Sequence, residues 1–143
     1  MKGSSDNGKR ILIVDDEEPI RSFLREAFEQ HGYAVIEAAN SEEALALLGK
    51  ESVPLMFLDL KLPGMSGVEL CRRIRTDHPI ACIYAMTGYT SLFELADCRE
   101  VGFDDYFIKP VDLQQFLKAA REGFEKIDRW TERHADRERE TAS

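Results

Sequence analysis

The sequence lacks long hydrophobic runs, an apolar leader and an excess of positive charge. No apolar stretch approaches the about 18 residues that a membrane-spanning helix requires, and the polar residues 1–9 contain no apolar segment of the kind found in signal peptides. The net charge of −8 argues against a nucleic-acid-binding surface, which needs clustered Lys and Arg. We therefore expect a cytoplasmic domain that binds neither membranes nor nucleic acid.

Cysteine is also scarce. The chain has three, Cys71, Cys82 and Cys98, and no two of them have the spacing of a CxxC motif. Each lies in an apolar or helical stretch, so we expect free, buried thiols in a reducing compartment. No pair of His or Cys residues has the spacing of zinc ligands, which argues against a zinc site.

Short apolar runs alternate with amphipathic stretches five times along the chain. Near-continuous apolar runs are typical of parallel strands that are covered on both faces. Apolar residues at helical spacing predict a helix after each run, with Asn40 and Ser66 as N-caps of the second and third helices. The predicted strands cover residues 10–14, 33–38, 54–59, 80–86 and 103–108.

The helical periodicity also predicts which side chains face the core. We expect the first helix to bury Phe23 among its apolar residues, and the fourth to bury Leu92, Leu95 and Ala96. The element order is (βα)5, which predicts a doubly wound α/β domain. Right-handed crossovers place its helices on both faces of one five-stranded parallel sheet.

In doubly wound folds the functional crevice lies at the carboxyl ends of the strands. Asp15 and Asp16 follow the first predicted strand, and Asp59 ends the third. Thr87 follows the fourth strand and Lys109 follows the fifth. Four separate segments therefore deliver three carboxylates, one hydroxyl and one amine to the same rim.

These residue types suit magnesium and phosphoryl chemistry. Neighbouring carboxylates raise one another's pKa values unless a cation lies between them, and Mg²⁺ prefers oxygen ligands. Asp16 and Asp59 are the expected direct ligands, with Asp15 bound directly or through water. A carboxylate can also act as a nucleophile and form an acyl phosphate, with the Lys109 ammonium and the Thr87 hydroxyl stabilising the incoming phosphoryl charge.

Four motifs, "IVDDEEP", "FLDLKLPGMSG", "AMTGY" and "DDYFIKP", resemble the receiver domain of bacterial two-component response regulators. The resemblance covers residues 9–125 and implies a flavodoxin-like sandwich with strand order 2-1-3-4-5. It implies that Asp59 accepts a phosphoryl group from a sensor histidine kinase or a phosphotransfer protein. The chain would then catalyse its own phosphorylation and slow autodephosphorylation, rather than turn over a free substrate.

The resemblance also implies the ligands of the metal and of the phosphoryl group. Asp15 and Asp16 would hold Mg²⁺ together with the phosphoacceptor and the backbone carbonyl of Lys61. Thr87 and Lys109 would contact the phosphoryl group.

Other positions flank the expected pocket. Tyr106 matches the switch aromatic of the family, which turns inward when the pocket threonine moves toward the phosphate. Gly88 and Pro110 lie beside the pocket, and Gly88 leaves the approach of a phosphoryl oxygen clear. Our hypothesis for Lys61 and Tyr89, at the pocket mouth, is that they set the lifetime of the aspartyl phosphate by admitting or excluding water.

Three other functions would use the same fold. An FMN-binding flavodoxin would have a Ser-, Thr- or Gly-rich loop after the first strand, where this chain is acidic. A haloacid-dehalogenase-type phosphatase would separate its two aspartates by one residue, whereas Asp15 and Asp16 are adjacent. A pseudo-receiver, a phosphorylation-independent interaction module, stays as the alternative. The next acids, Glu17 and Glu18, are assigned to the start of the first helix, whose positive end they suit, and not to the site.

The remaining predictions concern output and domain boundaries. By resemblance, the face formed by helix four, strand five and helix five reports phosphorylation to an effector domain, a partner or a second copy in a homodimer. We expect one receiver domain over residues 10–125 after a flexible lead-in (residues 1–9). Residues 126–143 are interpreted as a charged helical extension, as a linker toward a removed effector domain, or as a weak dimer contact centred on Ile127 and Trp130.

Overall fold

The computed structural model describes residues 9–88 and 91–142. The predictions for the first eight residues and for Tyr89 fall outside those residues. The elements in chain order are β1 (Arg10–Val14), α2 (Glu18–Gln30), β2 (Ala34–Ala38), α3 (Ser41–Leu48), β3 (Leu55–Asp59), α4 (Gly67–Asp77), β4 (Cys82–Thr87), α5 (Leu92–Val101), β5 (Asp105–Ile108) and α6 (Leu113–Ala142).

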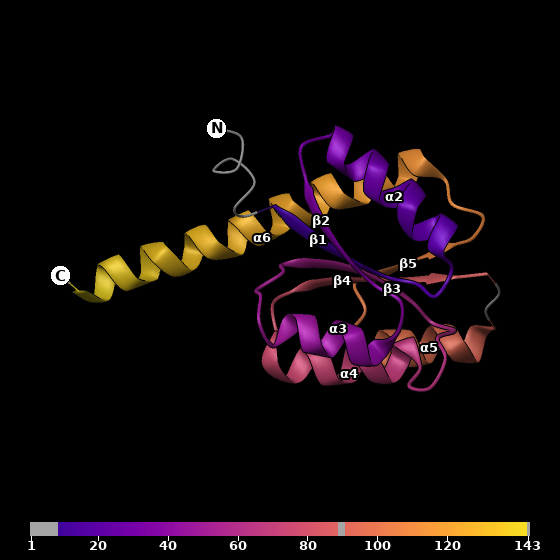
Figure 1. Cartoon of the computed structure of the whole chain (residues 1–143). Helices are drawn as coiled ribbons and strands as arrows, with labels where there is room; N and C mark the ends of the chain where they lie inside the picture. The colour runs from indigo at the N-terminus through magenta and orange to yellow at the C-terminus, as the bar shows by residue number, and fades with distance from the viewer. Residues whose placement is uncertain (1–8, 89–90, 143) are drawn as a thin grey trace.

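The five strands form one parallel sheet in the order β2-β1-β3-β4-β5. Helices α2 and α6 cover one face of this sheet, and α3, α4 and α5 lie on the other (Figure 1). The predicted doubly wound α/β fold with strand order 2-1-3-4-5 is confirmed.

Each face of the sheet has its own hydrophobic core, because successive side chains of a strand point to opposite faces. In β1, Ile11 and Ile13 pack with Phe28 and Phe116 beneath α2 and α6. Leu12 belongs to the core on the other face, under α3, α4 and α5. This double coverage explains why the central strands are apolar at nearly every position.

The predicted helix starts and faces are confirmed in part. The side chains of Asn40 and Ser66 accept hydrogen bonds from backbone N–H groups in the first turns of α3 and α4, as expected for N-caps. Phe23, however, is 49% exposed and Leu92 is 83% exposed. Ala96 is exposed as well. The reason for the error in α5 is that this helix packs against the sheet through Cys98 near its C-terminal end, so its first turn lies beyond the core.

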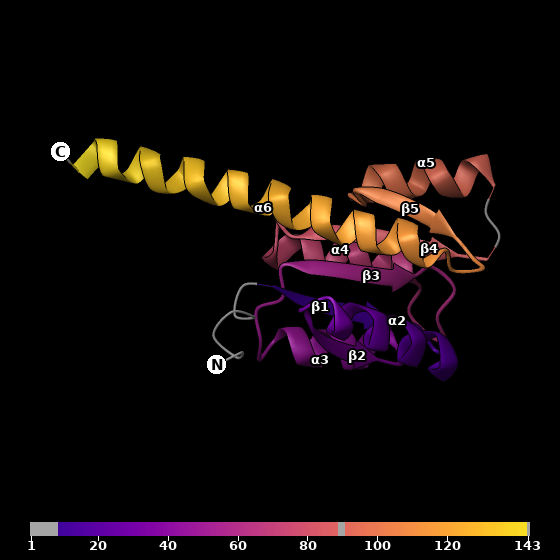
Figure 2. The ribbon, with the colours of Figure 1, turned by 90° about the horizontal axis from the view of Figure 1, so that it is seen from above.

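Helix α6 begins on the sheet and continues past its edge. Figure 2 shows the second half of the helix projecting away from the sheet, and Phe124 is the last of its residues in the buried core. Gly123 allows the close approach of the first half. A β-carbon there would lie 2.6 Å from Leu55 Cδ1 and 2.9 Å from Tyr84 Oη. Among the described residues, no helix combines the length and the hydropathy that a membrane span needs.

All three cysteines are free and buried, as predicted. Burial raises the pKa of the Cys71 thiol to about 12 and that of Cys82 to about 11. Because the thiolate is the reactive form, we expect these cysteines to react slowly in the folded chain.

Candidate functional site

The sheet register brings four strand ends together at one edge. Val14 pairs with Leu58, so the residues that follow, Asp15 and Asp59, are neighbours across β1 and β3. Asp59 pairs with Met86, which places it beside the end of β4. The last pair of the sheet joins Thr87 to Ile108, the residue before Lys109. The predicted meeting of these side chains therefore follows from the parallel pairing itself.

Asp15 and Asp59 are buried carboxylates. Asp15 is 0% exposed and Asp59 is 3% exposed. Asp15 Oδ1 accepts a hydrogen bond from the backbone N–H of Glu17 at 2.8 Å. Asp15 Oδ2 is buried and accepts no well-aligned hydrogen bond among the described residues, although Lys109 Nζ lies 2.8 Å away. A buried carboxylate oxygen of this kind, beside another carboxylate, is suited to a cation.

Lys109 supplies the positive charge of the site. Its Nζ lies 2.8 Å from Asp15 Oδ2, 3.2 Å from Asp59 Oδ2 and 3.4 Å from Glu17 Oε2. Burial disfavours the charged ammonium, but the carboxylates of Asp15 and Asp59 outweigh that effect and raise the pKa of Lys109. The lysine therefore stays charged and holds two buried acids together.

The pKa of Asp59 is raised, first by burial and further by the charge of Asp15. The backbone N–H of Lys61 donates a hydrogen bond to Asp59 Oδ1 at 3.0 Å. This hydrogen bond and the charge of Lys109 lower the pKa of Asp59 and oppose the effect of burial. Additional positive charge would therefore stabilise the ionised form of the Asp59 carboxylate. A cation or an electrophile at this position would relieve the conflict.

Four carboxylates, one more than expected, form the acidic cluster. Oxygen atoms of Asp15, Asp16, Glu17 and Asp59 all lie within 4.8 Å of one another. Glu17 is the N-cap of α2, as expected for the helix start, and its side chain also lies 3.4 Å from Lys109 Nζ, a contact that was not predicted. No sequence signal separates it from Glu18, since the turn at Asp15 decides where each side chain lies.

The loop after Asp59 is tightly packed against it. A β-carbon on Gly67, the first residue of α4, would overlap the carbonyl oxygen of Asp59, so the helix start and the strand end are in close contact. The side chain of Lys61 turns outward and forms an ion pair with Glu94 at 3.1 Å. Glu94 belongs to the capping box of α5, in which it is paired with Ser91. The loop that carries Asp59 is therefore tied to the start of α5.

The other predicted site residues lie around this cluster. Thr87 is fully buried, and its carbonyl oxygen accepts a hydrogen bond from the backbone N–H of Lys109 at 2.7 Å. Gly88 is exposed, and a β-carbon there would meet no atom of the described residues within 4 Å. Pro110 is exposed and follows Lys109 through a cis peptide bond. Tyr106 lies apart from them, 40% exposed on the outer side of β5.

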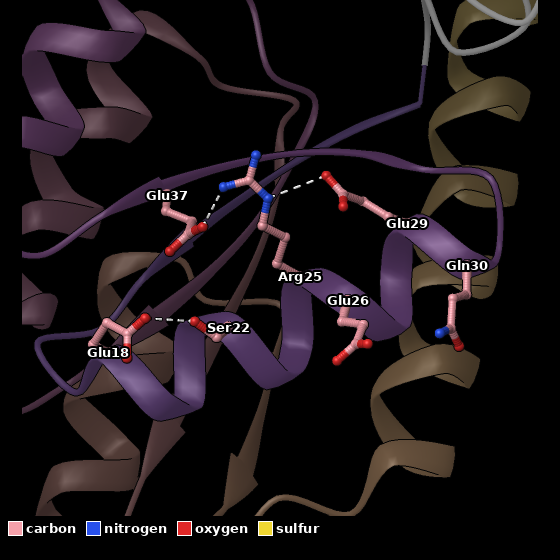
Figure 3. A pocket seen from close by; sticks show the side chains of 7 residues that line it. All are labelled: Glu18, Ser22, Arg25, Glu26, Glu29, Gln30 and Glu37. Atoms are coloured by element: carbon pink, nitrogen blue, oxygen red, sulfur yellow. Dashed lines mark hydrogen bonds and ion pairs between the residues drawn. The ribbon is translucent and has the colours of Figure 1, made fainter.

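Two of the hollows outside the acidic cluster lie on α2 and between α5 and β5. One, of about 500 Å³, runs between α5 and β5 and is lined by Leu92, Leu95 and Tyr106 among others. Figure 3 shows the other, of about 540 Å³, on the outer side of α2. There Arg25 forms ion pairs with both Glu29 and Glu37 at the surface. Such exposed pairs contribute little to stability or to chemistry.

Comparison with known proteins identifies the family and agrees with the observed fold. The response regulator receiver domain family matches residues 11–121. The chain is 36% identical over 113 residues to sporulation initiation phosphotransferase F of Bacillus subtilis, covering 79% of this chain and 91% of that protein. Several other curated relatives are much longer, and the chain spans 28–49% of their length.

Solved structures show the same likeness. A response regulator receiver domain protein from Methanospirillum hungatei superposes with a TM-score of 0.82 at 35% identity, covering 85% of this chain and 97% of that one. A response regulator protein from Burkholderia pseudomallei, solved with a phosphorylated aspartic acid, a calcium ion and citrate, has a TM-score of 0.75 at 32% identity and coverages of 86% and 72%. The chain belongs to the receiver domain family of two-component response regulators.

Proposed function

We propose that the chain is a phosphoacceptor switch in which Asp59 receives a phosphoryl group from the phosphohistidine of a sensor histidine kinase or a phosphotransfer protein. The observation that carries the proposal is the position of Asp59. It is a buried carboxylate of raised pKa, 3.2 Å from the Lys109 ammonium and beside three further carboxylates. The proposed transfer forms a bond between an Asp59 oxygen and phosphorus while the bond from phosphorus to the histidine nitrogen breaks, and that nitrogen keeps the electron pair.

The donor set fits Mg²⁺. Asp15 Oδ2 is buried and lacks a well-aligned hydrogen bond, the cluster is made of carboxylate oxygens, and a hard cation requires such oxygens. Asp15, Asp16 and Asp59 would hold the ion with the backbone carbonyl of Lys61, and Glu17 is close enough to join them directly or through water. When bound, Mg²⁺ would supply charge neutralisation for the phosphoryl oxygens.

The chain's own residues would do the rest. Lys109 keeps a positive charge next to Asp59 and would stabilise the charge of the transferring group. The Thr87 hydroxyl would donate a hydrogen bond to a phosphoryl oxygen from the adjacent strand end. Because Asp15 fixes Lys109 from the other side, the ammonium is positioned before the phosphoryl group arrives.

Acetyl phosphate with MgCl₂ tests this function without a cognate kinase. Intact-mass spectrometry should show the addition of one phosphoryl group to the wild-type chain and to Asp77→Asn, an exposed aspartate at the end of α4. Asp59→Asn should gain none, and EDTA should abolish the reaction. If the wild type gains no phosphoryl group, or Asp59→Asn gains one equally well, the alternative of a pseudo-receiver replaces the phosphoacceptor function.

The lifetime of the phosphoryl group is proposed to depend on Lys61 and Tyr89. Lys61 is held by Glu94 at 3.1 Å, so its side chain stays beside the loop that carries Asp59. Decay of the aspartyl phosphate in Lys61→Ala and Tyr89→Ala should differ from the wild type. Unchanged decay rates in both variants would contradict this role.

The proposed output face combines α5, β5 and α6. The hollow of about 500 Å³ between α5 and Tyr106 would accept a partner, an effector domain or a second copy after Tyr106 turns inward. The phosphoryl group adds close to two negative charges and would shift a two-state equilibrium rather than build a new fold. As for other receivers, a cytoplasmic location is proposed, and it agrees with the three free thiols.

A further inference from the structure

The second half of α6 carries an exposed apolar and basic surface that the phosphoacceptor function does not use. Trp130 is 54% exposed, and it lines two hollows, one on each side of it along the helix, which we together call the groove. We name the residues on this side of the helix the Trp130 stripe: Ile127, Trp130, Arg133, His134 and Arg137.

The inner part of the groove is an apolar notch of about 350 Å³ where α6 leaves the sheet. Ile80, in the loop before β4, is 66% exposed and lines this notch with Pro79, Ile127 and Trp130. A volume at the low end of the roughly 300–1,000 Å³ of ligand pockets has room for one or two apolar side chains. The notch lies at the edge of the sheet opposite to the strand ends that carry Asp15 and Asp59.

The charged residues of the notch form ion pairs with one another. Asp104 contacts Arg75 at 3.0 Å and Lys126 at 3.3 Å. Two cations and one carboxylate therefore line it, which leaves a net positive charge beside the apolar residues.

The outer part of the groove is basic. Arg133, His134 and Arg137 line a hollow of about 410 Å³ with Trp130, because residues three, four and seven positions apart share one side of a helix. His134 contacts Glu138 at 3.0 Å, whereas both arginines lack a carboxylate partner among the described residues. The acids Asp128, Glu132 and Asp136 recur every four residues and occupy the other side.

We propose that the Trp130 stripe and the adjoining notch dock an acidic amphipathic helix of a partner protein. The partner would place an apolar side chain between Ile80 and Trp130, and its carboxylates would pair with Arg133 and Arg137. Trp and Arg at the centre of a groove are the residue types that dominate binding energy at protein interfaces. A helix laid along a groove in this way is a recurrent form of peptide recognition.

Charge favours this partner over a parallel second copy of the chain. Two parallel Trp130 stripes facing each other would bring Arg133 and Arg137 of one chain against the same residues of the other. Like charges across an interface are costly. An acidic partner removes that repulsion, and a parallel contact between extensions centred on Ile127 and Trp130 is therefore disfavoured.

Trp130 is the only tryptophan of the chain, so its fluorescence reports on this surface alone. The probe is an 18-residue helix-forming peptide with a Leu and Phe stripe at i, i+3, i+4 and i+7, flanked by Glu. The control peptide has Gln in place of Glu. Titrating the full chain with the Glu peptide should shift Trp130 emission to shorter wavelength, and raising the salt concentration should weaken binding.

Variants measured by anisotropy of the fluorescein-labelled peptide locate the site. Trp130→Ala, and separately Arg133→Glu with Arg137→Glu, should each weaken binding about 10-fold or more. Arg139→Glu is the matched control, because Arg139 lies in the same extension but outside the groove. It should bind within about 2-fold of the wild type, and circular dichroism should show equal helix content in all variants.

Four outcomes would overturn the proposal. The Glu peptide could bind no more tightly than the Gln peptide, or the groove variants could bind as the Arg139 control does. A single-stranded 12-nucleotide DNA could bind more tightly than the Glu peptide, which would assign the stripe to nucleic acid. Sedimentation could show that the wild type is a dimer and Trp130→Ala a monomer, which would assign the Trp130 stripe to a second copy of the chain.

Discussion

Replacing Lys109 by methionine removes the only cation that the described residues place between Asp15 and Asp59, while keeping most of the side-chain volume. Asp15 is 0% exposed and Asp59 is 3% exposed, so neither carboxylate can be rehydrated without local rearrangement. We expect Lys109→Met to fold but to be markedly less stable than the wild type in the absence of metal.

The magnitude follows from burial. Removing one partner of a buried ion pair costs about 3–5 kcal/mol, because it leaves an uncompensated charge. The Lys109 side chain is 13% exposed and contacts the exposed Glu17 as well, which favours the lower end, about 3 kcal/mol. For a chain of this size such a loss lowers Tm by about 10 °C.

The stability lost in Lys109→Met should depend on pH in a defined direction. Lys109 lowers the pKa of Asp59 and burial raises it, so removing the ammonium raises this pKa further. A carboxyl whose pKa is higher in the folded than in the unfolded chain costs stability above its folded pKa and nothing below its unfolded pKa, about 3.9 for Asp. The deficit of Lys109→Met is therefore largest near neutral pH and shrinks on acidification.

Urea unfolding of wild type, Lys109→Met and the exposed-lysine control Lys118→Met measures these effects with EDTA and with MgCl₂. Mg²⁺ at ten times its dissociation constant stabilises a single-site protein by about 1.4 kcal/mol. The stabilisation should be larger in Lys109→Met, where the ion replaces the missing positive charge. Equal stability of Lys109→Met and Lys118→Met at neutral pH, or a deficit unchanged by both acid and Mg²⁺, would refute this account of the site.

Three further predictions concern packing and reactivity. Gly67→Ala should slow phosphorylation by acetyl phosphate as well as lower stability, because its β-carbon would displace the Asp59 carbonyl; intact mass and urea unfolding measure the two effects. Gly123→Ala should lose about 1–3 kcal/mol in urea unfolding without affecting phosphorylation, because the added carbon lies 2.6 Å from Leu55 Cδ1. Cys71, with its pKa raised to about 12, should not react with Ellman's reagent until the chain unfolds.

Gly49→Ala is the control for both glycine variants. Its β-carbon would meet only backbone carbonyl oxygens, at 3.5 and 3.6 Å, so the substitution should leave stability and phosphorylation close to wild type. A loss in Gly49→Ala equal to that in Gly123→Ala would contradict the packing explanation. Rapid reaction of Cys71 in the native chain would show that its helix opens far more readily than its burial implies.

Much of the site could be predicted because parallel strands end at a common edge. A buried apolar run predicts each strand, and the residue after it must then lie at the carboxyl edge. That Asp15, Asp59 and Lys109 all lie at one edge follows from that rule, and the strand order makes the ends of β1 and β3 neighbours. The same local pattern correctly predicted the N-caps at Asn40 and Ser66.

Tertiary structure decided what local periodicity could not. Glu17 and Glu18 are identical in sequence terms, and only the turn at Asp15 brings the Glu17 carboxylate to Lys109. Leu92 follows the helical pattern, yet it is exposed because the first turn of α5 extends beyond the core. Sequence by itself determined which chemical groups lie at the edge of the sheet, because the apolar run of each strand is a local signal that marks where the strand ends. The contacts that each group makes there depend on loops and on helix packing, which are set by residues far apart in the chain.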